Sequence, residues 1–105
     1  MSQFIKVADV DEIEPGGRLS VVVEDSPVLV IRVGDEFFAI EDVCTHDGQP
    51  LTDGPVSGQE ITCPRHGARF DLASGRALCM PATEPVRTFP VQVRDGAVYV
   101  KADED

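Results

Sequence analysis

Apolar residues gather in short runs separated by turn residues, a pattern typical of β-strands. No segment keeps a sustained apolar period of 3.6 residues, so we predict almost no helix. Valine and other β-branched residues fill several runs, which favours strands. The predicted strands cover residues 4–10, 19–24, 28–33, 36–40, 60–62, 69–72, 91–94 and 97–100.

Two dipeptides between predicted strands are typical of hairpin turns. They are Gly34-Asp35 and Asp95-Gly96, and the second predicts a type I′ turn. Ser26-Pro27 is predicted to interrupt the pattern earlier in the chain. In the last hairpin, alternation places Val91, Val93, Val98 and Val100 on one buried face, with Gln92, Arg94 and Tyr99 outside.

Glycine and proline recur between residues 41 and 87, where only two short strands are predicted. A long loop-rich segment in a compact domain is usually functional or disordered. Because it carries two Cys/His pairs, we interpret residues 41–87 as a binding subdomain. Its base would be the strands of residues 4–40 and 88–101, within a single all-β domain over residues 1–105.

The formal charge of −10 comes from 19 acidic and 9 basic residues. Nucleic acids and anionic membranes are bound through basic patches, so both are disfavoured as partners, whereas steering toward a basic protein is favoured. The N-terminal residues do not resemble a signal peptide. The longest strongly apolar run, Val28 to Ile31, is far too short to span a bilayer. We expect a monomer in the reducing cytosol, where thiolate ligands stay reduced.

Candidate ligands lie in two arms, Cys44-Thr45-His46 and Cys63-Pro64-Arg65-His66-Gly67. Four soft or borderline ligands in two pairs indicate a metal site. In the usual zinc spacing the two cysteines lie close together and so do the two histidines, whereas each arm here mixes the two residue types. Mixed arms favour a two-iron, two-sulfide cluster with two thiolates and two imidazoles. A structural zinc module remains the alternative.

The charge of such a cluster follows from its parts. Two ferric ions, two sulfides and two thiolates sum to zero, whereas a cluster held by four thiolates carries −2. Adding an electron is therefore easier, and the reduction potential is higher than in all-cysteine ferredoxins. Tight turns at Gly48, Pro64 and Gly67 would bring backbone N–H groups close to the sulfurs.

Both arms resemble those of Rieske-type ferredoxins, and the similarity extends over about residues 4–101. It includes Phe38-Ala39-Ile40, Gly75, Pro85, Phe89-Pro90-Val91 and residues 96–100. The resemblance implies stacked antiparallel sheets with a cluster-binding subdomain at one end. It also implies that Cys44 and Cys63 bind the inner iron, that His46 and His66 bind the outer iron, and that Met80-Pro81-Ala82 covers the cluster.

The chain departs from respiratory-complex Rieske proteins in two ways. Those carry an extra cysteine in each arm, and hydroxyl residues where this chain has Ala68 and Phe70. Without hydroxyl donors the potential should lie near the low end of the Rieske range, at about −150 mV. These departures indicate the soluble branch that serves oxygenases and reductases. The remaining cysteine, Cys79, is interpreted as a small buried apolar residue.

The resemblance implies an electron carrier rather than an enzyme. It would take single electrons from a flavin-containing NAD(P)H reductase and pass them to a terminal oxygenase, such as an aromatic-ring dioxygenase, with His46 and His66 at the exit edge. The alternatives are the small subunit of an NAD(P)H nitrite reductase and a stand-alone Rieske protein linked to cluster assembly.

Overall fold

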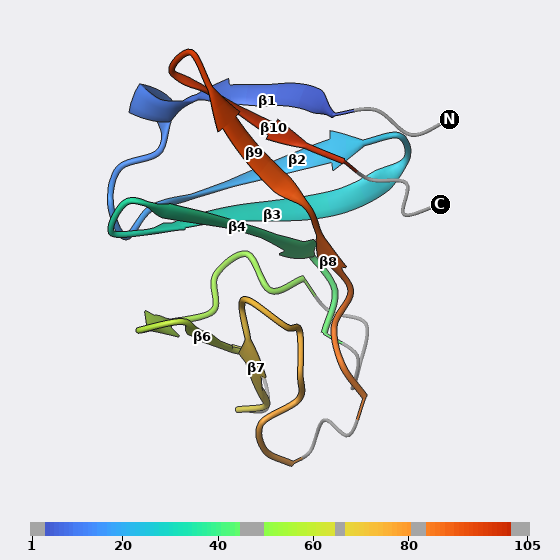
Figure 1. Ribbon diagram of the computed structural model, residues 1–105. Helices are drawn as coiled ribbons and strands as arrows, with labels where there is room; N and C mark the ends of the chain where they lie inside the picture. Colours follow the sequence, from blue (N-terminus) through green and yellow to red (C-terminus); the bar gives the residue numbers. More distant parts are fainter. Residues whose placement is uncertain (1–3, 45–49, 65–66, 81–83, 102–105) are drawn as a thin grey trace.

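The computed structural model describes residues 4–44, 50–64, 67–80 and 84–101, in which three antiparallel sheets are stacked as layers (Figure 1). The only helical element described is a 3₁₀ turn, η1 (Val10–Glu12), and no described helix is long and apolar enough to cross a membrane. The expectation of an all-β fold with almost no helix is confirmed. The strands are β1 (Ile5–Asp9), β2 (Arg18–Val23), β3 (Ser26–Val33), β4 (Glu36–Glu41), β5 (Val56–Ser57), β6 (Glu60–Thr62), β7 (Arg69–Asp71), β8 (Thr88–Phe89), β9 (Val91–Arg94) and β10 (Ala97–Val100).

The first sheet has the order β1-β10-β9 and contains the predicted type I′ hairpin. Asp95 and Gly96 have φ values of +51° and +77°, as that turn requires, so the prediction is confirmed. The register pairs Val93 with Val98, which puts their side chains on one face. However, Val93 is 48% exposed, so its predicted burial was wrong. It lies beside the turn on an edge strand, which has a neighbouring strand on one side only.

The second sheet has the order β2-β3-β4-β8 and contains the other predicted hairpin, at Gly34. The predicted break at Ser26-Pro27 was wrong, because these residues begin β3. The chain turns instead at Glu24 and Asp25, whose φ values are +49° and +72°. Proline is tolerated because it lies near the end of the strand, where its carbonyl still accepts a hydrogen bond from the Asp42 N–H at 3.0 Å.

β3 is buried on both faces, and this explains its continuous apolar run. Val28 and Val30 pack in a hydrophobic cluster with residues of the first sheet. Leu29 and Ile31, which point to the opposite face, pack in a second cluster with residues of the third sheet. All four side chains are fully buried. A strand between two layers needs apolar residues at consecutive positions rather than at alternate ones.

The third sheet, β5-β6-β7, comes entirely from the loop-rich segment of residues 41–87. β6 and β7 match two predicted strands, whereas β5 was not predicted, nor was β8 in the second sheet. Each missed strand has two residues, too few to show an alternating pattern. Phe70 of β7 packs in the same cluster as Ile40 of β4. The third sheet is therefore packed against the second through a shared core.

Candidate metal centre

Two of the four predicted ligands, Cys44 and Cys63, lie in the same hydrophobic cluster. Each follows the end of a strand: β4 ends at Glu41 and β6 at Thr62. Their exposed fractions are 0% and 1%, and no disulfide joins them. The other two predicted ligands, His46 and His66, lie outside the described residues. Within the described ranges, no group of three or more potential metal-binding side chains is gathered.

The second arm is closed by backbone hydrogen bonds. The Cys63 N–H donates to the Ala68 carbonyl at 2.7 Å, and the Gly67 N–H donates to the Cys63 carbonyl at 3.1 Å. Gly67 has a φ of +79°, so the predicted tight turn is confirmed there. Arg65, like His66, is outside the described part of the chain. The backbone on both sides of this arm is thus held at the base by β6 and β7.

The first arm is held at its base by the side chain of Asp42. Its carboxylate accepts a hydrogen bond from the Leu51 N–H at 2.7 Å and another from the Thr52 hydroxyl. Arg18 of β2 donates to the Thr52 carbonyl at 2.9 Å and also to the Gly54 carbonyl. Sequence reasoning missed Asp42 and Arg18, because neither belongs to a Cys/His pattern. The position of Asp42, two residues before Cys44, was the only available signal.

The segment before the predicted covering loop lies against the second arm. The Leu78 N–H donates to the Arg69 carbonyl at 2.7 Å, and the Cys79 thiol donates to the Gly67 carbonyl at 3.5 Å. Cys79 is partly exposed, so its interpretation as a buried apolar residue was wrong. The thiol has polar partners at the surface instead. Met80 is 73% exposed, and the rest of the predicted covering loop, Pro81-Ala82, lies outside the described residues.

The Arg69 guanidinium, whose Nε is 3.5 Å from Cys79 Sγ, lowers the pKa of the Cys79 thiol from its ordinary value. A lower pKa means that the reactive thiolate forms at lower pH. We therefore expect iodoacetamide to alkylate Cys79 first, with a rate that rises at lower pH than for a model thiol. Arg69→Gln should move the rate profile toward higher pH. The measurement is the pH dependence of alkylation, with the site located by peptide mass spectrometry.

Glu60 provides the matched control, because its charge raises the pKa of the Cys79 thiol. Glu60→Gln should therefore move the profile in the opposite direction, toward lower pH. Profiles that coincide for the wild type and both variants would contradict this role of Arg69.

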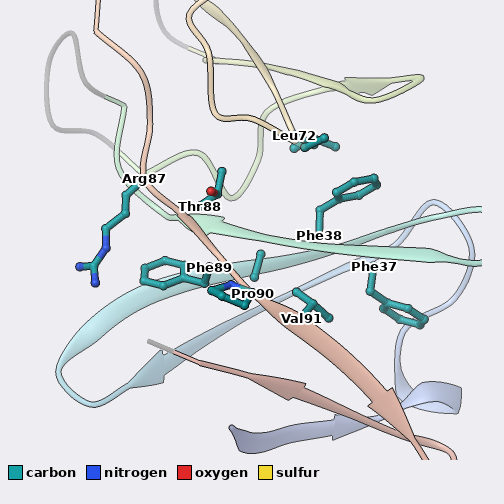
Figure 2. Close-up of a pocket in the computed structure, with 10 residues that line it drawn as sticks. Phe37, Phe38, Leu72, Arg87, Thr88, Phe89, Pro90 and Val91 are labelled. Carbon is teal, nitrogen blue, oxygen red and sulfur yellow. The ribbon is translucent and has the colours of Figure 1, made fainter. Parts of the chain in front are cut away.

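The second and third sheets border a groove of about 550 Å³. Figure 2 shows Phe38 and Leu72 on one side of β4 and Phe37 on the other. Ala39 of β4 and Ala73, which follows β7, also line the groove. The other lining residues belong to β8, β9 and their flanks, and Arg87 and Pro90 are among them. No cysteine lines this groove in the described part of the chain.

Residues 3–90 match the family model described as the Rieske [2Fe-2S] domain. A curated relative from Ralstonia sp, the ferredoxin component of naphthalene 1,2-dioxygenase/salicylate 5-hydroxylase systems, is 35% identical over 100 residues. That alignment covers 95% of this chain and 96% of the relative. The likeness therefore extends over nearly the whole of both proteins.

Solved structures agree with this comparison. One chain in a complex of reduced oxygenase and oxidized ferredoxin in carbazole 1,9a-dioxygenase has a TM-score of 0.90 and 38% identity, covering 97% of this chain and 95% of that one. A putative NADH-dependent nitrite reductase small subunit from Mycobacterium tuberculosis has a TM-score of 0.88, covering 100% of this chain and 99% of that one. Its identity is 23%, so it shows only that the fold is shared.

Proposed function

Because this chain belongs to the Rieske [2Fe-2S] family, we propose that it is the ferredoxin component of an aromatic-ring dioxygenase system. In this role it passes single electrons from an NAD(P)H-dependent flavoprotein reductase to a terminal oxygenase and is not itself an enzyme. The observation that carries the proposal is full-length similarity to ferredoxin components of such systems. The solved oxygenase–ferredoxin complex, in which a chain has the same fold, supports the terminal oxygenase as partner.

The proposed ligands are the Cys44 and Cys63 thiolates on the inner iron and the His46 and His66 imidazoles on the outer iron. Burial of both cysteines in one cluster supports their share of this assignment. Thiolate and imidazole are donors that suit iron–sulfur chemistry. When bound, a [2Fe-2S] cluster supplies reversible one-electron transfer. The apolar side chains around the two cysteines exclude water from the inner side of the site.

The surface around the second arm supports docking of a protein partner. Leu78 and Met80 are 38% and 73% exposed, and they follow a segment that is hydrogen-bonded to this arm. Contiguous exposed apolar patches mark interaction surfaces, and we propose that Leu78 and Met80 contribute to one beside the second arm. The net charge of −10 favours a partner with a basic surface. We propose that the chain acts in the cytosol as a monomer. Light scattering of the purified protein would test the oligomeric state.

The deciding experiment begins with the visible absorption and EPR spectra of freshly purified protein, and with its iron and sulfide content. We expect one Rieske-type cluster per chain. A colourless, zinc-containing protein would overturn the proposal. Reduction is then followed by stopped-flow absorption with the flavoprotein reductase of a naphthalene dioxygenase system, and product formation is measured with its terminal oxygenase. Reduction without any electron transfer to an oxygenase would favour the nitrite reductase or cluster-assembly alternative.

A further inference from the structure

Asp42 is a charged residue inside the protein that electron transfer itself does not require. It is 7% exposed, and it is the only charged side chain that is buried in the described part of the chain. A buried carboxylate is costly unless hydrogen bonds compensate for lost hydration. Its described donors are the Leu51 N–H at 2.7 Å, the Thr52 hydroxyl and, at 3.4 Å, the Ser20 hydroxyl. All three of these donors are neutral groups, and the Arg18 guanidinium of the same network donates to the Thr52 carbonyl.

These hydrogen bonds connect the two ends of the segment that carries the first arm. Asp42 lies two residues before Cys44, whereas Leu51 and Thr52 lie beyond the arm. The hydrogen bond from the Leu51 N–H to Asp42 therefore joins two positions that are nine residues apart in the sequence. Because two extended residues span at most about 7 Å, the Cα atoms of Asp42 and Cys44 are close. Both side chains are also buried, where screening by solvent is weak.

The same network continues to the second arm. Arg18 donates to the carbonyls of Thr52 and Gly54, which holds the segment after the first arm against β2. Gly54 packs so closely on Thr62 that a Cβ atom there would overlap the Thr62 carbonyl oxygen. The Thr62 N–H donates to the Pro55 carbonyl at 2.9 Å, and Cys63 is the next residue. The chain segment held by Asp42 is thus joined directly to the strand that presents Cys63.

We propose that Asp42 is a positioning residue that sets the place of Cys44 relative to Cys63, and that its fixed negative charge lowers the reduction potential of the site. This inference rests on the proposed function, because a potential exists only if the cluster is bound. Closing the arm keeps two thiolates near each other before the metal enters. A buried negative charge nearby disfavours the reduced state, which carries one more negative charge than the oxidised state.

The test compares three variants of the cluster-loaded protein by redox titration and EPR. Asp42→Asn removes the charge but keeps a side chain that can accept from Leu51 and bond to Thr52. We expect it to raise the equilibrium constant for reduction about tenfold, equal to about 59 mV for one electron. Asp53→Asn is the matched control, since Asp53 lies next to Thr52 but is exposed. Its charge is screened by solvent, so the expected change is less than about twofold.

Asp42→Ala tests the positioning role, because alanine removes the charge and all of these hydrogen bonds. We expect loss of the visible spectrum in excess chelator to be at least about tenfold faster than in the wild type. If Asp42→Asn does not accumulate, Thr52→Val is measured in its place to test the positioning role. That variant keeps the carboxylate and removes one donor, so faster cluster loss without a rise in potential supports the proposal.

Two results would overturn the inference. One is a potential for Asp42→Asn that matches that of Asp53→Asn. The other is a cluster in Asp42→Ala that is as persistent as in the wild type. Either result leaves the proposed function intact, provided the wild-type protein shows a Rieske EPR signal. Absence of that signal from the wild type would instead defeat the proposed function.

Discussion

Replacing Cys63 by alanine is expected to abolish cluster binding, with an affinity lower by more than about 100-fold. The estimate follows from groups that only orient metal ligands, whose loss already costs 10–100-fold. Cys63 supplies one of two proposed thiolates. Apart from the other proposed ligand, Cys44, the described residues of its cluster are apolar and cannot replace it. Alanine fills part of the space of the thiol, which limits the damage to packing. The measurements are iron and acid-labile sulfide per chain, together with visible absorption.

The third cysteine provides a matched control for this experiment. Cys79→Ala removes a thiol that is partly exposed and hydrogen-bonded at the surface, outside the proposed ligand set. Its iron and sulfide content should equal that of the wild type. A Cys63→Ala protein with a full iron and sulfide content would show that Cys63 is not a ligand. Loss of iron from Cys79→Ala would place that residue in the site.

Gly75→Ala is expected to destabilise the fold by about 3 kcal/mol or more. Gly75 has a φ of +78°, which costs an L-residue about 1–2 kcal/mol. An added Cβ would overlap the carbonyl oxygen of Val86 and lie 3.0 Å from Cγ2 of Thr88, and overpacking adds about 1–3 kcal/mol. The Val86 N–H also donates to the Gly75 carbonyl at 2.8 Å, so the two segments cannot separate without losing that bond.

Urea denaturation followed by far-UV circular dichroism measures this effect. A loss of 3 kcal/mol should lower the midpoint by more than about 1 M. Gly58→Ala is the control, since Gly58 has a φ of +59° but no atom within 4 Å of the added Cβ. Gly58→Ala should lower the free energy of unfolding only by the cost of holding an L-residue at positive φ, about 1–2 kcal/mol. Equal midpoints for the two variants would show that the contact with Val86 relaxes without cost.

Predictions from local patterns succeeded where the physical cause was also local. The type I′ turn at Asp95-Gly96 needs two residues that tolerate positive φ, and the dipeptide states this directly. Gly67 is similar, because a glycine in a short arm indicates a tight turn. The apolar runs located most strands, since alternating or continuous burial leaves a pattern in the residues that form it. These features depend on only a few consecutive residues.

Predictions of environment failed where the neighbours came from distant parts of the chain. Val93 follows the apolar alternation, but its place on an edge strand leaves it exposed. Cys79 resembles a small apolar residue in isolation, but Arg69 and Gly67 give its thiol polar partners. Ser26-Pro27 resembles a break until pairing with β2 places both residues in a strand. In each case the outcome depended on which segments became neighbours.

The candidate metal centre shows the same difference between features with local causes and features that depend on distant residues. The identities and spacing of the Cys/His arms are chemical facts of the chain, and they were enough to indicate the type of cluster and hence the family. The residues that hold these arms in place could be identified only from the folded structure. Asp42 reaches Leu51 and Thr52 across the first arm, and Arg18 reaches the same segment from β2. A ligand's chemistry belongs to its own side chain, whereas its position depends on contacts between residues far apart in the chain.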